Sequence, residues 1–324
     1  MTKISKKKVF LTRTLPELTT KELKKNYHVE IHKGPFPISK KNLIEKIKNK
    51  DGLICYPYDK IDKQVIMAGT KLKTISTFSV GYDHIDIKFA KKRKISIGYT
   101  PNILTIATAD LTIALMLDLL RRVTEGDRLI RSGKWKNVFG AVTYVGEEIA
   151  GKTLGILGLG RIGVAVAKRA QSFGIKIIYH NRTRLEPKKE KSLKVQYVTL
   201  NDLFRKSDIV SLHIPYSKQT HELVKLPLIK KMKKSAYLIN TSRGKIINEK
   251  DLVVALKRKI ISGAALDVFL NEPIGMTHPL TKMQNVVLTP HIGSSSIITR
   301  TKMAELTVKN LKLGLHGKKL IYSV

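Results

Sequence analysis

A glycine-rich turn at mid-chain constrains the fold more than any other feature of the sequence. An apolar run, 153–157, predicts a β-strand that leads into Gly158-x-Gly160-x-x-Gly163, and an Ala/Val-rich stretch, 164–173, predicts a helix directly after it. In such a unit the first glycine makes a tight turn, the second lets a pyrophosphate approach the backbone, and the third lets the helix pack closely on the strand. The free N–H groups at the helix start favour phosphate. We therefore expect a Rossmann dinucleotide-binding unit, with a ligand-free glycine turn as the alternative.

The residues after the next predicted strand, 176–179, indicate which dinucleotide binds. NAD enzymes carry an acidic residue there, about 20 residues past the glycines, which binds the adenosine ribose 2′-OH. Here the chain reads His180-Asn181-Arg182-Thr183-Arg184. Guanidinium groups can bind a 2′-phosphate through charge-assisted hydrogen bonds, whereas a carboxylate would repel it. We therefore expect NADP (NADPH) to be preferred, with NAD as the second choice and a basic surface turn as the alternative interpretation.

The net charge of this 324-residue chain is extreme, because 61 Lys and Arg stand against 25 Asp and Glu to give +36. Such a charge attracts anionic ligands and could hold nucleic acid non-specifically. The lysines, however, are spread along the whole chain, and no recognised nucleic-acid motif accompanies them. We interpret the charge mainly as a solvated surface and expect no specific nucleic-acid partner.

Neither a membrane segment nor a disulfide is predicted. No apolar run approaches the length of a membrane helix, and the first residues lack the apolar core of a signal peptide. Cys55 is the only cysteine, so no intrachain disulfide can form. We expect a cytoplasmic protein with no membrane contact and no metal site.

Alternating strand and helix patterns predict an α/β protein with parallel sheets covered on both faces. The predicted strands of the first lobe are 9–12, 27–31, 52–56, 74–78 and 95–99, and its predicted helices are 18–25, 42–47, 63–68 and 86–92. A long apolar helix, 105–121, leads into a second lobe. After the glycine turn, further strands are predicted at 209–213, 236–240, 264–268 and 285–289. A final helix, 303–315, is predicted to return to the first lobe.

Polar residues stand where several of these strands end, the place where open α/β sheets bind ligands. Arg243, Asp267, Glu272 and His291 all follow or end predicted strands. Singly, each has an ordinary structural explanation. Together they suit reduction of a 2-oxo acid, because a planar Arg binds a carboxylate bidentately, a His supplies a proton to the developing alkoxide, and a carboxylate beside that His orients it.

With these motifs in this order, the chain resembles the D-isomer-specific 2-hydroxyacid dehydrogenase family over nearly its whole length. Ser79-Val80-Gly81-Tyr82-Asp83 resembles the family's substrate loop, and 100–110 resembles its entry to the cofactor domain. Within the family the chain is most similar to the glyoxylate/hydroxypyruvate reductases, through 131–135, 278–280 and the basic turn. Two positions depart from that pattern: Val138 replaces a second tryptophan, and Ser242 replaces a common alanine.

The resemblance implies an architecture and a set of site residues. It implies a flavodoxin-like substrate domain, 1–100 plus 296–324, a Rossmann NAD(P)-binding domain, 101–295, and a homodimer built on the cofactor domains. The implied catalytic residues are Arg243, Glu272 and His291. The implied substrate contacts are Val80, Gly81, Arg243, His291 and Ser294. The implied cofactor contacts are Thr108, Gly158, Gly160, Arg161, Ile162, Gly163, Asn181, Arg182, Thr183, His213, Ile214, Pro215, Thr241, Asp267 and Gly293.

The sequence therefore predicts a reductase that converts glyoxylate or hydroxypyruvate to the D-2-hydroxy acid with hydride from NADPH. The alternatives are another member of the family, of the D-lactate or phosphoglycerate type and NAD-linked, and a dinucleotide-sensing binding module that resembles corepressors. The absence of a regulatory C-terminal domain argues against the phosphoglycerate type.

Overall fold

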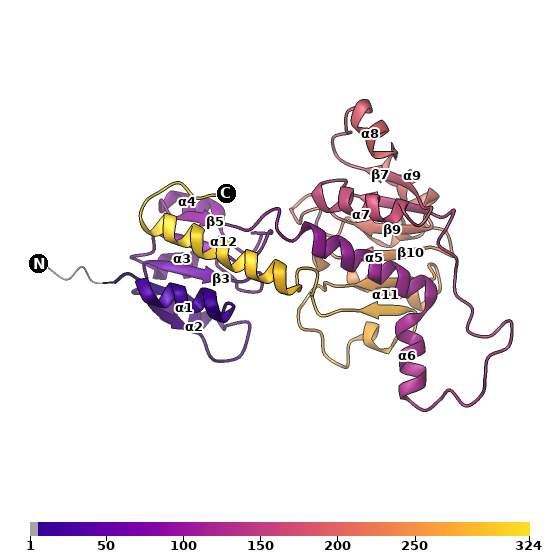
Figure 1. Cartoon of the computed structure of the whole chain (residues 1–324), viewed down its shortest axis with the longest axis horizontal. Helices are drawn as coiled ribbons and strands as arrows, with labels where there is room; N and C mark the ends of the chain where they lie inside the picture. Colours follow the sequence, from indigo (N-terminus) through magenta and orange to yellow (C-terminus); the bar gives the residue numbers. More distant parts are fainter. Residues whose placement is uncertain (1–5) are drawn as a thin grey trace, which may run out of the picture. The chain divides into compact units, whose positions relative to one another are not determined.

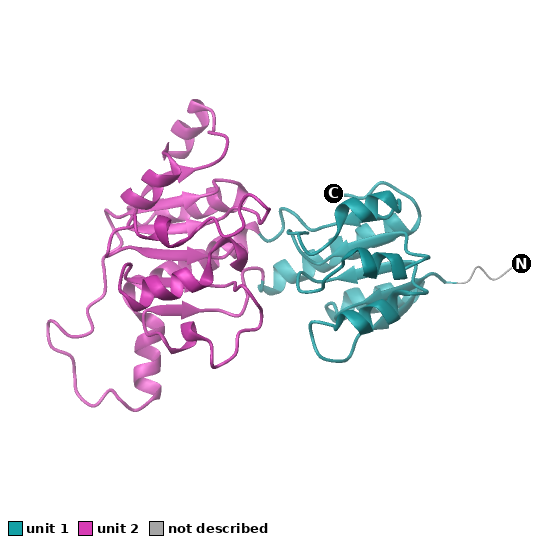
Figure 2. Ribbon diagram, turned by 180° about the vertical axis from the view of Figure 1, so that it is seen from behind, with its two compact units in different colours: residues 1–104, 295–324 teal, residues 105–294 magenta. Residues whose placement is uncertain are grey.

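The computed structural model describes residues 6–324 and divides the chain into two compact units. The first five residues, which belong to the predicted first domain and to the stretch without a signal-peptide core, lie outside that range. Unit 1 comprises Met1–Leu104 and Ser295–Val324, and unit 2 comprises Thr105–Ser294 (Figure 2). None of the helices within residues 6–324 is long and apolar enough to cross a membrane.

Unit 1 is built on a five-stranded parallel sheet with the order β2-β1-β3-β4-β5. Its strands are β1 (Lys8–Leu11), β2 (His28–Ile31), β3 (Gly52–Cys55), β4 (Thr74–Thr77) and β5 (Ser96–Gly98). Its helices are α1 (Glu17–Asn26), α2 (Lys40–Ile47), α3 (Lys63–Ala68), α4 (Ile87–Lys92) and α12 (Ile297–Leu315). Two separate apolar cores contain residues from α2, α3 and α4 on one side and from α1 and α12 on the other, so helices cover both faces of the sheet.

Helix α12 begins six residues before the predicted start at 303 because the chain supplies an N-cap there. The Ser296 hydroxyl accepts the Thr299 N–H at 3.2 Å, which satisfies one of the free donors at the helix start. The helix then lies along the sheet of unit 1 (Figure 1), with Met303, Val308 and Leu311 buried against it. The final helix thus belongs to unit 1.

Unit 2 is built on a seven-stranded parallel sheet with the order β12-β11-β10-β9-β6-β7-β8. Its strands are β6 (Thr153–Leu157), β7 (Lys176–His180), β8 (Val195–Tyr197), β9 (Ile209–Leu212), β10 (Tyr237–Asn240), β11 (Gly263–Leu266) and β12 (Val286–Leu288). Its α-helices are α5 (Thr105–Arg121), α6 (Val123–Arg131), α7 (Arg161–Gln171), α8 (Pro187–Leu193), α9 (Leu200–Lys206), α10 (Leu226–Ile229) and α11 (Glu249–Lys257), and 3₁₀ turns cover Gly244–Ile246 and Pro279–Lys282. The prediction of two parallel α/β lobes is confirmed.

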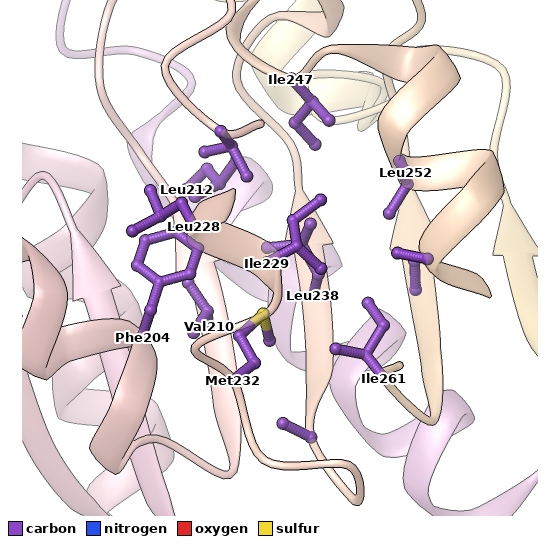
Figure 3. Close-up of a cluster of buried hydrophobic side chains, with 14 of the residues drawn as sticks. Phe204, Val210, Leu212, Leu228, Ile229, Met232, Leu238, Ile247, Leu252 and Ile261 are labelled. Carbon is purple, nitrogen blue, oxygen red and sulfur yellow. The ribbon is translucent and has the colours of Figure 1, made fainter. Parts of the chain in front are cut away.

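Two apolar cores cover the two faces of this sheet. One takes residues from α5 and α7, which lie side by side in Figure 1. The other takes residues from α9, α10 and α11, and Figure 3 shows Phe204, Ile229 and Leu252 among its buried side chains. The chain order along the sheet reverses beside β6, and ligands of open α/β sheets bind at such a switch point, outside the carboxyl ends of the strands.

Candidate functional site

Each glycine of the mid-chain turn has a different structural reason to be glycine. Gly158 has φ +99°, and a Cβ there would lie 2.7 Å from the carbonyl carbon of His213. A Cβ on Gly163 would lie 2.3 Å from the Gly158 oxygen, so no side chain fits where α7 meets β6. A Cβ on Gly160, in contrast, would meet nothing within 4 Å. Gly160 therefore leaves open space beside the helix start, as the approach of a pyrophosphate requires.

The start of α7 presents N–H groups to this space. Gly160 is the N-cap residue and offers no side chain to bind them. The first backbone hydrogen bond of the helix runs from Val164 N–H to the Gly160 oxygen at 2.9 Å. The N–H groups of the first turn of α7, which precede that of Val164, have no partner within the helix and are thus available to an anion, with the helix dipole adding a positive end. Arg161, Ile162 and Gly163 fit the predicted contacts to a dinucleotide phosphate.

The residues of the basic turn after β7 differ in the partners that they bind. The Asn181 Oδ1 accepts the Leu159 N–H at 2.6 Å and so braces the glycine turn. Arg184 donates from Nε and Nη2 to the two carboxylate oxygens of Glu190, at 2.9 and 2.8 Å. The Arg184 guanidinium, followed by the Tyr179 hydroxyl, lowers the pKa of Glu190 to about 2. Both arginines are exposed, but Arg184 is held in an ion pair, whereas no ion pair to Arg182 occurs among residues 6–324.

The turn after β10 holds Arg243 through its neighbours. The buried Asn240 side chain donates to the Arg243 carbonyl oxygen at 3.0 Å and accepts the Ser242 N–H at 3.0 Å. The Arg243 Nη1 donates to the Ser242 carbonyl at 2.8 Å, and the side chain is half-buried. Thr241 shares a 3.0 Å hydrogen bond with Thr112 of α5. The backbone around Arg243 is therefore fixed from within unit 2.

His291 and Glu272 form a direct pair. The His291 Nδ1 lies 2.7 Å from Glu272 Oε2, and the side chains are 22% and 16% exposed. Glu272 Oε1 accepts the Phe269 N–H at 2.8 Å, which fixes the carboxylate. His291 itself has φ +54°, a left-handed conformation that is uncommon for residues other than glycine and occurs often at functional sites. The pairing places the Glu272 carboxylate on Nδ1 of the His291 ring.

Asp267 supports the loop that carries His291. Its carboxylate accepts the Ile292 and Gly293 N–H groups, both at 2.8 Å, and the Thr289 hydroxyl at 2.7 Å. Burial raises the pKa of Asp267, and these hydrogen bonds offset only part of that rise. β11 ends at Leu266, so Asp267 lies just beyond the strand rather than within it. Its predicted contact to the cofactor stays a prediction, because the contacts seen here are all to this loop.

The remaining predicted cofactor contacts lie at the same edge of the sheet. Thr108 of α5 donates to the Gly293 carbonyl at 3.0 Å. His213 follows β9, where its Nε2 lies 2.8 Å from the Ser211 hydroxyl, and burial lowers its pKa to about 4. Ile214 and Pro215 follow it along the chain, and Ser294 follows Gly293 at the end of unit 2. The predicted substrate residues Val80 and Gly81 follow β4, in unit 1.

Sequence reasoning missed two residues that shape this site, Asn240 and Gly244. Asn240 binds the Arg243 turn, as described above. A Cβ on Gly244 would lie 2.0 Å from the Phe269 carbonyl, which brings the Arg243 turn against the loop that holds Glu272. For Gly244 the sequence did offer a signal, because this glycine directly follows the predicted catalytic residue Arg243. The arrangement joins a fixed cation, a carboxylate-bound imidazole and a phosphate-binding turn along one edge of the unit 2 sheet.

Comparison with known families agrees with this geometry. The model of the D-isomer specific 2-hydroxyacid dehydrogenase NAD binding domain matches residues 113–293. A glyoxylate reductase of Thermofilum pendens is 46% identical over 316 residues, covering 97% of this chain and 93% of that protein. A glyoxylate reductase of Thermococcus litoralis is 46% identical over 309 residues, covering 94% and 93%.

Solved structures show the same architecture over the whole length. A protein from Thermus thermophilus matches with a TM-score of 0.91 at 41% identity, covering 98% of this chain and 99% of that one. An NADPH-dependent glyoxylate/hydroxypyruvate reductase from Sinorhizobium meliloti, in complex with NADP and malonate, matches with a TM-score of 0.85 at 29% identity, covering 99% and 97%.

Proposed function

This chain belongs to the D-isomer specific 2-hydroxyacid dehydrogenase family, and on that premise we propose that it reduces glyoxylate to glycolate with NADPH. Hydroxypyruvate, which would give D-glycerate, is the second substrate of the same class. The observation that carries the proposal is the 2.7 Å pair between His291 and Glu272 in the same unit as an open dinucleotide-binding turn. The names of the similar glyoxylate reductases support this choice of substrate.

The proposed roles follow from the chemistry of the side chains. Arg243 binds the substrate carboxylate, because a planar guanidinium matches its two oxygens, and the N–H groups of Val80 and Gly81 bind it as well. The bound dinucleotide supplies hydride to the carbonyl carbon. The carbonyl oxygen takes a proton from His291 Nε2, while Glu272 holds Nδ1 and stabilises the charged ring before transfer. Hydride and proton together convert the carbonyl to the alcohol.

Selection of NADPH is assigned to Arg182. Both arginines of the basic turn are exposed, but Arg184 is paired with Glu190, whereas no ion pair to Arg182 occurs within the part of the chain that is described. No carboxylate stands at the end of β7 to bind a ribose 2′-OH, since Asn181 occupies that place and is bound to Leu159. The single guanidinium at this rim favours a 2′-phosphate.

A substrate panel tests the function directly. Purified protein is mixed with glyoxylate, hydroxypyruvate, pyruvate and 3-phosphohydroxypyruvate, each with NADPH and with NADH, and dinucleotide oxidation is followed. Fastest turnover with glyoxylate and NADPH is expected, and Arg243→Ala should raise KM by roughly tenfold or more, since it removes hydrogen bonds to a charged group. If the protein binds NADPH but turns over none of these acids, the reductase function is wrong and the dinucleotide-sensing module is the better interpretation.

We also propose that two copies pair through unit 2. Apolar side chains are exposed on α6 and on the segment after it: Val123, Ile130, Trp135, Val138, Phe139, Val142 and Val145. Figures 1 and 2 show α6 and this segment standing away from the sheet of unit 2. Val138 and Val142 are 87% and 90% exposed. An exposed apolar patch of this kind marks a protein interface, and a second copy presents the same surface.

Molecular mass in solution, measured by light scattering after size exclusion, tests this pairing. A dimer is expected for the wild type and a monomer for Val142→Glu. Leu18→Glu serves as the control, because Leu18 is 82% exposed but lies on α1 of unit 1. A monomeric wild type, or a dimer that survives Val142→Glu and dissociates on Leu18→Glu, contradicts the proposed surface.

A further inference from the structure

A directional chain of side-chain hydrogen bonds lies directly beneath the Val80-Gly81 loop. It connects Thr77, the last residue of β4, with Ser79 and His84, which begin and end the loop. Thr77 Oγ1 lies 2.8 Å from Ser79 Oγ and 3.0 Å from His84 Nε2. Ser79 Oγ donates to the Gly81 carbonyl oxygen at 2.5 Å. Thr77 and Ser79 are buried, so these hydroxyl groups have no bulk water to bind instead.

The direction of every bond in this chain follows from the number of protons. A hydroxyl has one proton to donate, and Ser79 gives its proton to a carbonyl, which only accepts. Ser79 must therefore accept from Thr77, and Thr77 must in turn accept from His84. It follows that His84 carries a proton on Nε2. The chain runs from His84 through Thr77 and Ser79 to the Gly81 carbonyl.

The loop is also held by its backbone on either side. The Ser79 carbonyl accepts the Thr100 N–H at 2.9 Å, and the His84 carbonyl accepts the Ile61 N–H at 2.9 Å. The N–H and C=O of a trans peptide point in opposite directions. Because the Ser79 carbonyl is bound to Thr100, the Val80 N–H is turned the other way. The Val80–Gly81 peptide therefore lies between two anchored carbonyls, those of Ser79 and Gly81.

We propose that the His84–Thr77–Ser79 chain is the positioning device that, together with the Ser79–Thr100 hydrogen bond, orients the Val80 and Gly81 N–H groups for the carboxylate of the substrate. This inference rests on the proposed function, in which those two N–H groups bind the carboxylate. The three side chains act on the backbone: by binding the Gly81 carbonyl they fix the plane of the Gly81–Tyr82 peptide, which limits rotation of the neighbouring Val80–Gly81 peptide that carries the Gly81 N–H. The Val80 N–H is oriented by the hydrogen bond between the Ser79 carbonyl and Thr100. A loop without this chain would keep its fold but lose the fixed direction of the two donors, and preorganised donors are what small anionic ligands need.

The variants Ser79→Ala and Thr77→Val interrupt the chain, whereas Thr77→Ser keeps the hydroxyl. Ser76→Ala is the matched control, because Ser76 is also a buried hydroxyl of β4, and it donates to the Thr307 carbonyl of α12 at 2.8 Å. Measurements are KM and kcat for glyoxylate, the Kd of NADPH, the Kd of oxamate for the NADPH-bound protein, and the midpoint of urea unfolding.

We expect Ser79→Ala and Thr77→Val to raise the KM of glyoxylate and the Kd of oxamate roughly tenfold, with a smaller change in kcat and the same Kd of NADPH. Thr77→Ser should restore both constants. Ser76→Ala should lower the unfolding midpoint about as much as Ser79→Ala without raising KM. An equal rise of KM in Ser76→Ala, or unchanged KM in Ser79→Ala and Thr77→Val, overturns the proposal.

The Arg243→Ala variant distinguishes a failure of this proposal from a failure of the proposed function. If Arg243→Ala weakens oxamate and Ser79→Ala does not, the hydrogen-bond chain has no positioning role and the proposed function stands. If the wild type neither reduces glyoxylate nor binds oxamate, the proposed function fails, and the positioning role fails with it.

Discussion

Gly244 packs so closely on Phe269 that no side chain can be placed between them. A Cβ on Gly244 would lie 2.0 Å from both the carbonyl carbon and the carbonyl oxygen of Phe269. Gly244 follows Arg243, and the Phe269 N–H is bound to Glu272. This contact therefore couples the position of the cation to the position of the His291–Glu272 pair.

Gly244→Ala should disturb both halves of the site. Overpacking against backbone cannot be relieved by a rotamer change, so we expect a loss of unfolding free energy of about 1–3 kcal/mol or more, and a fall in kcat/KM for glyoxylate. Gly140→Ala is the control, because its Cβ would meet nothing within 4 Å. Urea unfolding and steady-state kinetics measure the two effects. A Gly244→Ala protein as active and stable as Gly140→Ala would contradict the coupling.

His291→Asn should remove the proton donor while leaving the dinucleotide site intact. Turnover should fall by roughly 10²–10⁴, the usual contribution of a positioned general acid. Glu272→Gln should reduce turnover less, because it keeps an acceptor near Nδ1 but loses the charge that stabilises the protonated ring. Pre-steady-state hydride transfer and NADPH binding by fluorescence check both variants. Turnover within a few-fold of the wild type in His291→Asn would assign the proton to another group.

Arg182→Ala and Arg184→Ala should differ in their effect on cofactor choice, although both remove one arginine from the same turn. Both side chains are exposed, but only Arg184 is paired with a carboxylate, that of Glu190, within the described residues. Arg182→Ala should raise the KM of NADPH on the order of tenfold, with little change for NADH, since a charge-assisted hydrogen bond of about 1.5–3 kcal/mol is weakened at an open rim. Arg184→Ala should leave the NADPH to NADH ratio near that of the wild type.

The double change Asn181→Asp with Arg182→Ala should move the preference to NADH. Asp at 181 keeps the oxygen that accepts the Leu159 N–H, and its second oxygen can bind a ribose 2′-OH. Kinetic constants for both dinucleotides measure the change. A wild type that uses NADH as well as NADPH would show that the basic turn is surface charge alone.

His213 should make the protein less stable in mild acid. Burial lowers its pKa from 6.5 to about 4, so the unfolded chain takes up this proton before the folded one does. The contribution of neutral His213 to the free energy of unfolding is complete above pH 6.5. It is lost as the pH falls towards 4, with a slope of at most about 1.4 kcal/mol per pH unit. Urea unfolding of wild type and His213→Gln between these pH values tests this. Parallel pH profiles of the two proteins would exclude His213 as the source.

Sequence patterns were enough to predict the α/β class, the dinucleotide-binding turn and the types of residue at the strand ends. These depend on local patterns: Gly158, Gly160 and Gly163 are each required within one strand–turn–helix unit, and apolar runs mark buried parallel strands. The element bounds were less exact. The helix predicted from 164 begins at Arg161, and α6, α8, α9, α10, α11 and β8 were not predicted. These are short or strongly polar segments whose burial depends on the sheet they cover.

Which polar groups become partners depends on how the chain packs in three dimensions. Arg182 and Arg184 are equivalent in the sequence, but Glu190 of α8 binds only Arg184 among the described contacts of the turn. Asp267 binds the His291 loop, and Gly244 contacts Phe269, although the partners in each case are 22 or more residues apart in the sequence. The Thr77–Ser79–His84 chain exists because the loop after β4 turns back on its own strand. Local periodicity carries no information about such contacts, since they depend on how separate segments meet in the packed fold.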